Sequence, residues 1–180
     1  MAAKTSVFYL TERLSIAAGG TLVSDTIDLG AYVDVADRQG ILVHEVDFIF
    51  QGKDNTGAMQ DLQATFTGDA TAFAQLTDLN RAGLVFADDR ALVASGQMLL
   101  DQGSNQLSSD ADLYPDNFGP TSAQGGRIVI NDQMYFAAKA IGTVATNDAL
   151  EVTVRVKCSV ISLSQKDFMA IALQSTAADN

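Results

Sequence analysis

The sequence is poor in the residues from which catalytic and metal centres are most often built. It has one histidine, His44, one cysteine, Cys158, and no tryptophan among its 180 residues. A single histidine excludes the histidine clusters of metal-dependent β-barrel enzymes, and a single cysteine excludes an internal disulfide. There is also no P-loop, no G-x-G-x-x-G and no G-x-S-x-G motif. The sequence therefore predicts a protein that is not an enzyme and needs no cofactor.

Long apolar runs are missing as well. The first residues, MAAKTSVFYLTERLS, are interrupted by Thr11, Glu12 and Arg13, which leaves no apolar stretch long enough for a secretory signal. No later stretch approaches the roughly 18 apolar residues of a membrane span. We therefore expect the mature chain to start near Met1 and to be made in the cytosol.

Positive charge is scarce. The chain has 11 Lys and Arg against 22 Asp and Glu, a net charge of −11, and residues 61–120 are the most acidic third. Such a field repels phosphate backbones, so we expect no direct binding of nucleic acid. Arg155 and Lys157 form the one close basic pair on a predicted strand face, and cross-strand pairing with Asp or Glu explains them more simply than a nucleic-acid site does.

Alternating apolar and polar residues are what the sequence does have. In EVTVRVKCSVISLS, residues 151–164, one face carries Val152, Val154, Val156, Cys158 and Val160. This period of two is the pattern of a half-buried β-strand. The face places Cys158 in the core rather than in a reactive site, and the adjacent Val160 and Ile161 indicate a bulge or bend.

A second alternating strand is predicted over residues 41–51. Its even positions, among them His44, form one mostly apolar face, while Glu45 and Asp47 share the other. Paired carboxylates serve glycosidases, but a solvated strand face is the simpler explanation. For His44 a hydrogen-bonded core or interface residue is the simpler explanation than a catalytic one.

Turn residues separate about eight to ten short strands in this chain. The stretch 61–67 alternates like a strand, the stretch 71–80 has a spacing nearer to that of a helix, and residues 83–101 read as three short extended pieces. Ser164 and Asp167 form a capping-box-like pair before a C-terminal segment, 164–180, that is expected to be a short helix or a flexible tail. The pattern predicts one all-β domain over residues 1–180, an antiparallel two-sheet sandwich or barrel with one or two short helices.

Residues 102–126 are predicted to form a long loop that projects from one end of the sandwich. They contain both prolines of the chain and many Gly, Ser, Asn and Asp residues. Leu113, Tyr114 and Phe118 give this loop apolar anchors, so we expect them, together with Arg155 and Lys157, to make contacts between subunits. Three carboxylates are weak candidates for a calcium site, although ordinary loop polarity is the simpler explanation: Asp110, Asp112 and Asp116.

The order of these features resembles the single jelly-roll capsid proteins of icosahedral viruses. The residues that carry the resemblance are the turn-rich loop, the segment GRIVINDQMYFAAKAIG (126–142) and the alternating EVTVRVKCSVISLS. In size and acidity the chain is most similar to the small major capsid proteins of tailless viruses that contain a membrane. The resemblance implies a single jelly roll of two facing sheets, self-association into capsomers and location in a virion assembled in the host cytoplasm.

The same resemblance implies particular partners. Copies of the chain itself come first, followed by other capsid proteins and an underlying membrane or protein layer. Residues 1–20 hold only Lys4 and Arg13 as basic residues, unlike the basic arms with which many capsid proteins condense single-stranded genomes. Two alternatives use the same fold without catalysis: a lectin-like or trimeric ligand-binding module, and a fibre subunit.

Overall fold

The computed structural model of the protein describes residues 2–111 and 126–177. Within them lie two helices, α1 (Leu62–Thr65) and α2 (Gln165–Ala177), and a set of antiparallel strands. The strands are β1 (Ala2–Ala3), β2 (Phe8–Ile16), β3 (Leu22–Asp28), β4 (Gln39–Lys53), β5 (Met59–Gln60), β6 (Ala70–Thr77), β7 (Leu92–Asp101), β8 (Gln106–Ala111), β9 (Arg127–Val129), β10 (Gln133–Ile141) and β11 (Ala149–Ser162).

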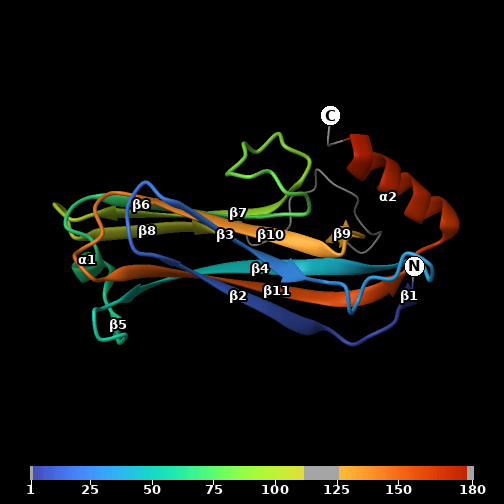
Figure 1. The fold of residues 1–180 in the computed structure, drawn as a ribbon, viewed down its shortest axis with the longest axis horizontal. Helices are drawn as coiled ribbons and strands as arrows, with labels where there is room; N and C mark the ends of the chain where they lie inside the picture. Colours follow the sequence, from blue (N-terminus) through green and yellow to red (C-terminus); the bar gives the residue numbers. More distant parts are fainter. Residues whose placement is uncertain (1, 112–125, 178–180) are drawn as a thin grey trace.

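The strands form two sheets that face each other (Figure 1). In the first sheet β2 pairs with β11, β11 with β4, and β4 with β9, with β1 and β5 as short additions. The second sheet has the order β3-β10-β6-β7-β8. The pairs β2–β11, β3–β10, β4–β9 and β6–β7 are therefore nested one inside the next along the chain. This nesting in two facing sheets is the jelly roll, which confirms the predicted fold class.

The core lies between the two sheets and is built from alternating positions of their strands. The five predicted core residues of β11 are all buried there: Val152, Val154, Val156, Cys158 and Val160. The rings of Phe48 and Phe136 stack across the sandwich at 6.1 Å between centroids. Gly96 leaves room for Phe48, because a Cβ at this position would lie 2.8 Å from Cδ2 of that ring.

A bulge in β4 changes which side chains of that strand point into the core. Lys157 pairs with Glu45 and Cys158 pairs with Val43, so His44 is the extra residue. Val46 and Phe48 face the core as predicted, but Leu42 lies in a separate apolar cluster, on the opposite face from the buried Val43. The bulge thus lies opposite Lys157 and Cys158, and not at Val160 and Ile161 as the sequence suggested.

Helix α2 begins as the sequence predicted. Ser164 and Asp167 form a reciprocal cap, in which Oγ of Ser164 donates to Oδ2 of Asp167 at 2.7 Å and accepts from the backbone N of Asp167 at 3.2 Å. Phe168 and Ile171 of the helix lie against the separate cluster. That cluster consists of Leu42, Ile128, Ile161, Leu163 and Ile171. Val160 and Ile161 therefore face two different apolar clusters on opposite sides of β11. Two adjacent apolar residues are explained in this way without a bulge.

Three local predictions were wrong. Residues 71–80 contribute to strand β6 and not to a helix, because Ala70, Ala72, Ala74 and Leu76 alternate into the core. Residues 62–65 form helix α1, whose first turn is capped by Oδ1 of Asp61 accepting from the N–H of Ala64 at 2.6 Å. Residues 92–101 form one continuous strand, β7, where shorter pieces were expected.

The segment 102–126, predicted as one loop, contains strand β8. Gln106–Ala111 pair with the end of β7 through a tight turn in which Asn105 has a positive φ of 51°. Residues 112–125 lie outside the described residues. Among the residues that the structure describes, no helix is long and apolar enough to cross a membrane.

Candidate functional site

The outer face of the first sheet is dense in paired charges. Strand alternation places Arg155 and Lys157 there, as the sequence predicted, on β11 between β2 and β4. Nζ of Lys157 lies 3.2 Å from Oε2 of Glu45, and the hydrogen bond from Lys157 to Glu45 is the main reason why the pKa of Lys157 is raised. The guanidinium of Arg155 lies over the ring of Tyr9, 5.3 Å from its centroid. Both basic side chains thus have partners within their own chain.

A buried carboxylate anchors the far end of the same face. Glu151 is 6% exposed and lies between Lys53 and Arg13, with Oγ of Ser15 donating to Oε1 at 2.8 Å. Burial alone would raise the pKa of Glu151, but the hydrogen bonds from Lys53 and Ser15 and the two positive charges outweigh it and lower the pKa. This face therefore holds its charges in fixed pairs.

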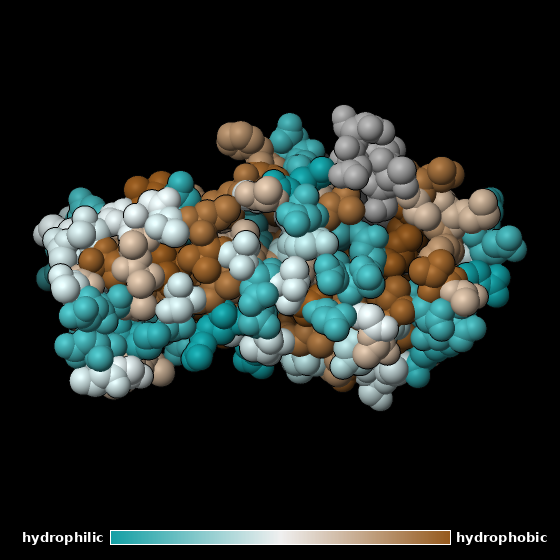
Figure 2. Space-filling model, viewed as in Figure 1, coloured by the Kyte–Doolittle hydropathy of each residue, from teal (hydrophilic) through white to brown (hydrophobic). Residues whose placement is uncertain are grey.

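On the outer face of the second sheet, the strands β10, β6 and β7 carry few charges. In the register of β10, β6 and β7, outward positions form cross-strand rows such as Ile141–Thr71–Leu99 and Lys139–Phe73–Gln97. Lys139, and Asp101 at the end of β7, are the charged residues that alternation places outward on these three strands. Figure 2 shows hydrophobic side chains at the surface in the region where Figure 1 draws β6, β7 and β8. We call the outward side of β10, β6 and β7 the uncharged face.

A shallow hollow of about 310 Å³ lies at one end of the uncharged face. Leu99 and Ile141 give it apolar walls, and they are 46% and 53% exposed. Its remaining lining residues are Asp69, Ala70, Thr71, Leu100 and Asp101. The hollow is therefore an open apolar depression with two carboxylates at its edge.

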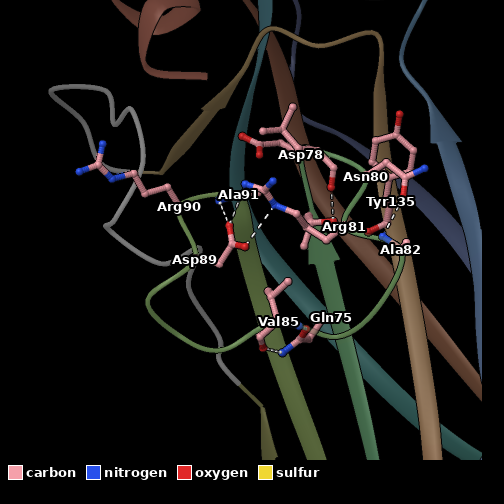
Figure 3. Close-up of polar contacts among 12 residues, drawn as sticks. Gln75, Asp78, Asn80, Arg81, Ala82, Val85, Asp89, Arg90, Ala91 and Tyr135 are labelled. Atoms are coloured by element: carbon pink, nitrogen blue, oxygen red, sulfur yellow. Dashed lines mark hydrogen bonds and ion pairs between the residues drawn. The ribbon is translucent and has the colours of Figure 1, made fainter. Parts of the chain in front are cut away.

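The loop 78–91 between β6 and β7 stands above the second sheet (Figure 1). The Gln75 side chain on β6 holds the loop through two hydrogen bonds to Val85: its Nε2 donates to the Val85 carbonyl at 2.8 Å, and its Oε1 accepts from the Val85 N–H at 2.7 Å. Arg81 and Asp89 form an ion pair at 3.1 Å across the loop (Figure 3). The Asp89 N–H donates to the Phe86 carbonyl at 3.0 Å. Phe86 itself is 86% exposed.

A buried ion pair ties the base of this loop to the first sheet. Arg127 on β9 is 1% exposed, and its Nη2 lies 2.7 Å from Oδ2 of Asp78. The same guanidinium donates to the backbone carbonyls of Arg90 at 2.6 Å and Leu92 at 3.1 Å. Burial raises the pKa of Asp78, and this effect outweighs the lowering by Arg127. Arg127 therefore fixes both ends of the loop at once.

The structure places His44 and Cys158 in structural roles. Nε2 of His44 lies 2.9 Å from Oγ of Ser159 on the neighbouring strand, and burial, with a smaller effect of Lys157, lowers the pKa of His44. Burial raises the pKa of the Cys158 thiol to about 12, which leaves it protonated at neutral pH. The Cys158 thiol therefore lacks the thiolate character of a nucleophile, and His44 has the hydrogen bond that the sequence analysis expected for it.

The predicted contacts in the loop 102–126 remain predictions. Leu113, Tyr114 and Phe118 lie outside the described residues, and so do the calcium candidates Asp112 and Asp116. Asp110 is in strand β8. Among the residues that the structure describes, no group of three His, Cys, Asp or Glu side chains could hold a metal ion.

The sequence analysis missed the loop 78–91 and the buried arginine. Residues 84–89 looked like an extended piece because they contain Leu84, Val85 and Phe86 in succession. Arg127 begins the segment GRIVIND, and an arginine at the start of a strand usually signals a solvated end. The pairing of Arg127 with Asp78, 49 residues away, has no local sequence signal.

No protein-family model matches this chain, and no curated protein matches it by sequence. Among solved structures, it is similar to the unassembled VP1 pentamer of Merkel cell polyomavirus, with 8% identity, a TM-score of 0.44, and 90% of this chain and 98% of that chain covered. VP1 of Trichodysplasia spinulosa-associated polyomavirus in complex with 3'-sialyllactose matches with 9% identity, a TM-score of 0.41, and coverage of 89% and 96%. The assignment of the jelly roll rests on the strand pairing of this chain and not on these likenesses.

Proposed function

We propose that this chain is a structural protein of an icosahedral virion, which self-assembles into capsomers of the shell and catalyses no reaction. The observation that carries the proposal is the uncharged face, an exposed sheet surface with apolar residues on a jelly roll of net charge −11. Charge elsewhere keeps copies apart, whereas this face lets them approach. The fold alone would serve many functions.

The proposal extends to the setting of the shell. The chain is made and assembled in the host cytoplasm, and its partners are its own copies, other capsid proteins, and a membrane or protein layer beneath the shell. The small major capsid proteins of tailless membrane-containing viruses are the class that it resembles most. With the basic residues Arg155 and Lys157 engaged by Tyr9 and Glu45, direct binding of the genome is not part of its role.

Size-exclusion chromatography followed by negative-stain microscopy of the purified protein tests the proposal. Closed particles, rings or regular sheets are the expected result. A monodisperse monomer would overturn the proposal, and a monomer that binds sugars would favour the lectin-like alternative instead.

A further inference from the structure

Loop 78–91 presents one large apolar side chain to solvent from a fixed backbone. Single exposed apolar residues are common on protein surfaces and need no explanation. Phe86 differs because the residues around it are held in place: Gln75 binds Val85 through both of its amide atoms, and Asp89 binds the Phe86 carbonyl. Because the backbone that carries this side chain is already held, binding through it requires little ordering of the loop, which suits an interface anchor.

The hollow on the same face offers a matching receptor. Val85 is bound to Gln75, and Gln75 lies four residues from Thr71 on the same side of β6. At ~3.3 Å per residue the anchor point of the loop is thus about 13 Å along the strand from the hollow. Leu99 and Ile141 line that hollow with exposed apolar surface. The face therefore carries both a projecting apolar group and an apolar depression.

We propose that a second copy of this chain binds the uncharged face in a twofold arrangement, with Phe86 of each copy inserted into the hollow of the other. This inference rests on the proposed function and names the contact through which self-association begins. The projection and the depression can both be used between the same two copies only when the copies are related by a twofold axis. Each copy then makes the same contact twice.

The charge of the uncharged face fits a second copy, and its area shows how much contact the loop must add. On β10, β6 and β7 the outward charges are Lys139 and Asp101, which have opposite signs, so this surface avoids the repulsion that the −11 charge imposes elsewhere. Three strands at ~4.8 Å spacing, each with about eight residues of ~3.3 Å, give a flat area of about 380 Å². Standard interfaces bury about 800 Å² of accessible surface per partner, so the loop 78–91 and the hollow that it enters must contribute about half of the contact.

Cross-linking of mixed single-cysteine variants tests the contact. One preparation carries Ala87→Cys, next to Phe86 and exposed, and the other Ile141→Cys, and a short bismaleimide is added to their mixture, so that only links between copies are made. The native Cys158 gives little background because it is buried and its pKa is raised to about 12. A covalent dimer is expected from this mixture. A mixture of Val35→Cys, which replaces another exposed apolar residue, with Ile141→Cys should give none.

Phe86→Ser provides the second measurement, with Met59→Ser as the matched control at another exposed apolar residue. Sedimentation should show a tenfold or larger weakening of self-association for Phe86→Ser, the effect of losing an interface anchor, and none for Met59→Ser. If the parent assembles but Phe86→Ser assembles equally well and no cross-link forms, the contact is wrong and the proposed function stands. If the parent itself stays monomeric, both are wrong.

Discussion

At the scale of single residues, Arg127 connects parts of the chain that no local pattern relates. Its guanidinium reaches Asp78 and the carbonyls of Arg90 and Leu92, while its Nε is buried with no hydrogen-bond partner among the described residues. Burying these charges is costly, so the pair adds little net stability compared with an apolar pair of the same volume. Removing one partner alone lowers the stability of the fold, because the other charge is left buried without a partner.

We therefore expect Arg127→Met to destabilise the protein by about 3–5 kcal/mol, since Asp78 and two carbonyls lose their partner. The double variant Arg127→Met, Asp78→Leu should recover a large part of this loss. Urea unfolding followed by circular dichroism measures both. A single variant as stable as the parent would mean that the ion pair does not hold the loop 78–91.

Glu151 gives a pH-dependent prediction with a definite sign. Its pKa in the folded protein is lowered from the ordinary value of 4.5, so its contribution to stability is present above that value and is lost as the pH falls through the folded-state pKa. Glu151→Gln should be less stable than the parent at pH 7 by about 1–3 kcal/mol, the strength of hydrogen bonds to a charged group. The difference should shrink below pH 4.5, and a difference independent of pH would contradict the assignment.

At the scale of elements, alternation predicted the long strands well because one face of each strand packs into the core and the other face points outward. The Val152–Val160 face of β11 was predicted in full. The prediction failed for β6, whose core face consists largely of alanines. Alanine favours helices over strands, and β6 is a strand because it pairs with β10 on one side and β7 on the other. The loop 78–91 was missed because its hydrogen bonds reach across the sheets.

The β4 bulge allows a test of strand register. Because His44 is the extra residue, its deletion restores a regular strand and leaves Val43 and Val46 facing the core. Deletion of Asp47 instead exchanges the inward and outward positions of the residues on one side of the deletion, which puts polar residues into the core. We expect the variant lacking His44 to unfold cooperatively on heating, whereas the variant lacking Asp47 should not fold. If both variants fold equally well, the bulge has been placed at the wrong residue.

At the scale of the whole molecule, the two sheet faces differ in how they meet solvent. The first sheet neutralises its charges in pairs such as Lys157 with Glu45, and the outward side of β10, β6 and β7 has few charges to neutralise. Composition shows that the chain is acidic, but it gives no sign that charge is scarce on the outward side of β10, β6 and β7. That segregation follows from register, which brings outward positions of β10, β6 and β7 into one surface.

The mass of the particle in solution tests the central claim, that this jelly roll is a self-assembling subunit, most directly. Sedimentation velocity of the parent protein over a range of concentrations at physiological salt should show the 19.0 kDa chain converting into discrete larger species with masses that are even multiples of it. Even multiples follow from the proposed twofold contact, so a closed species with an odd number of copies would contradict that contact alone and leave the self-assembly claim standing. A single species of 19.0 kDa at every concentration would contradict the account.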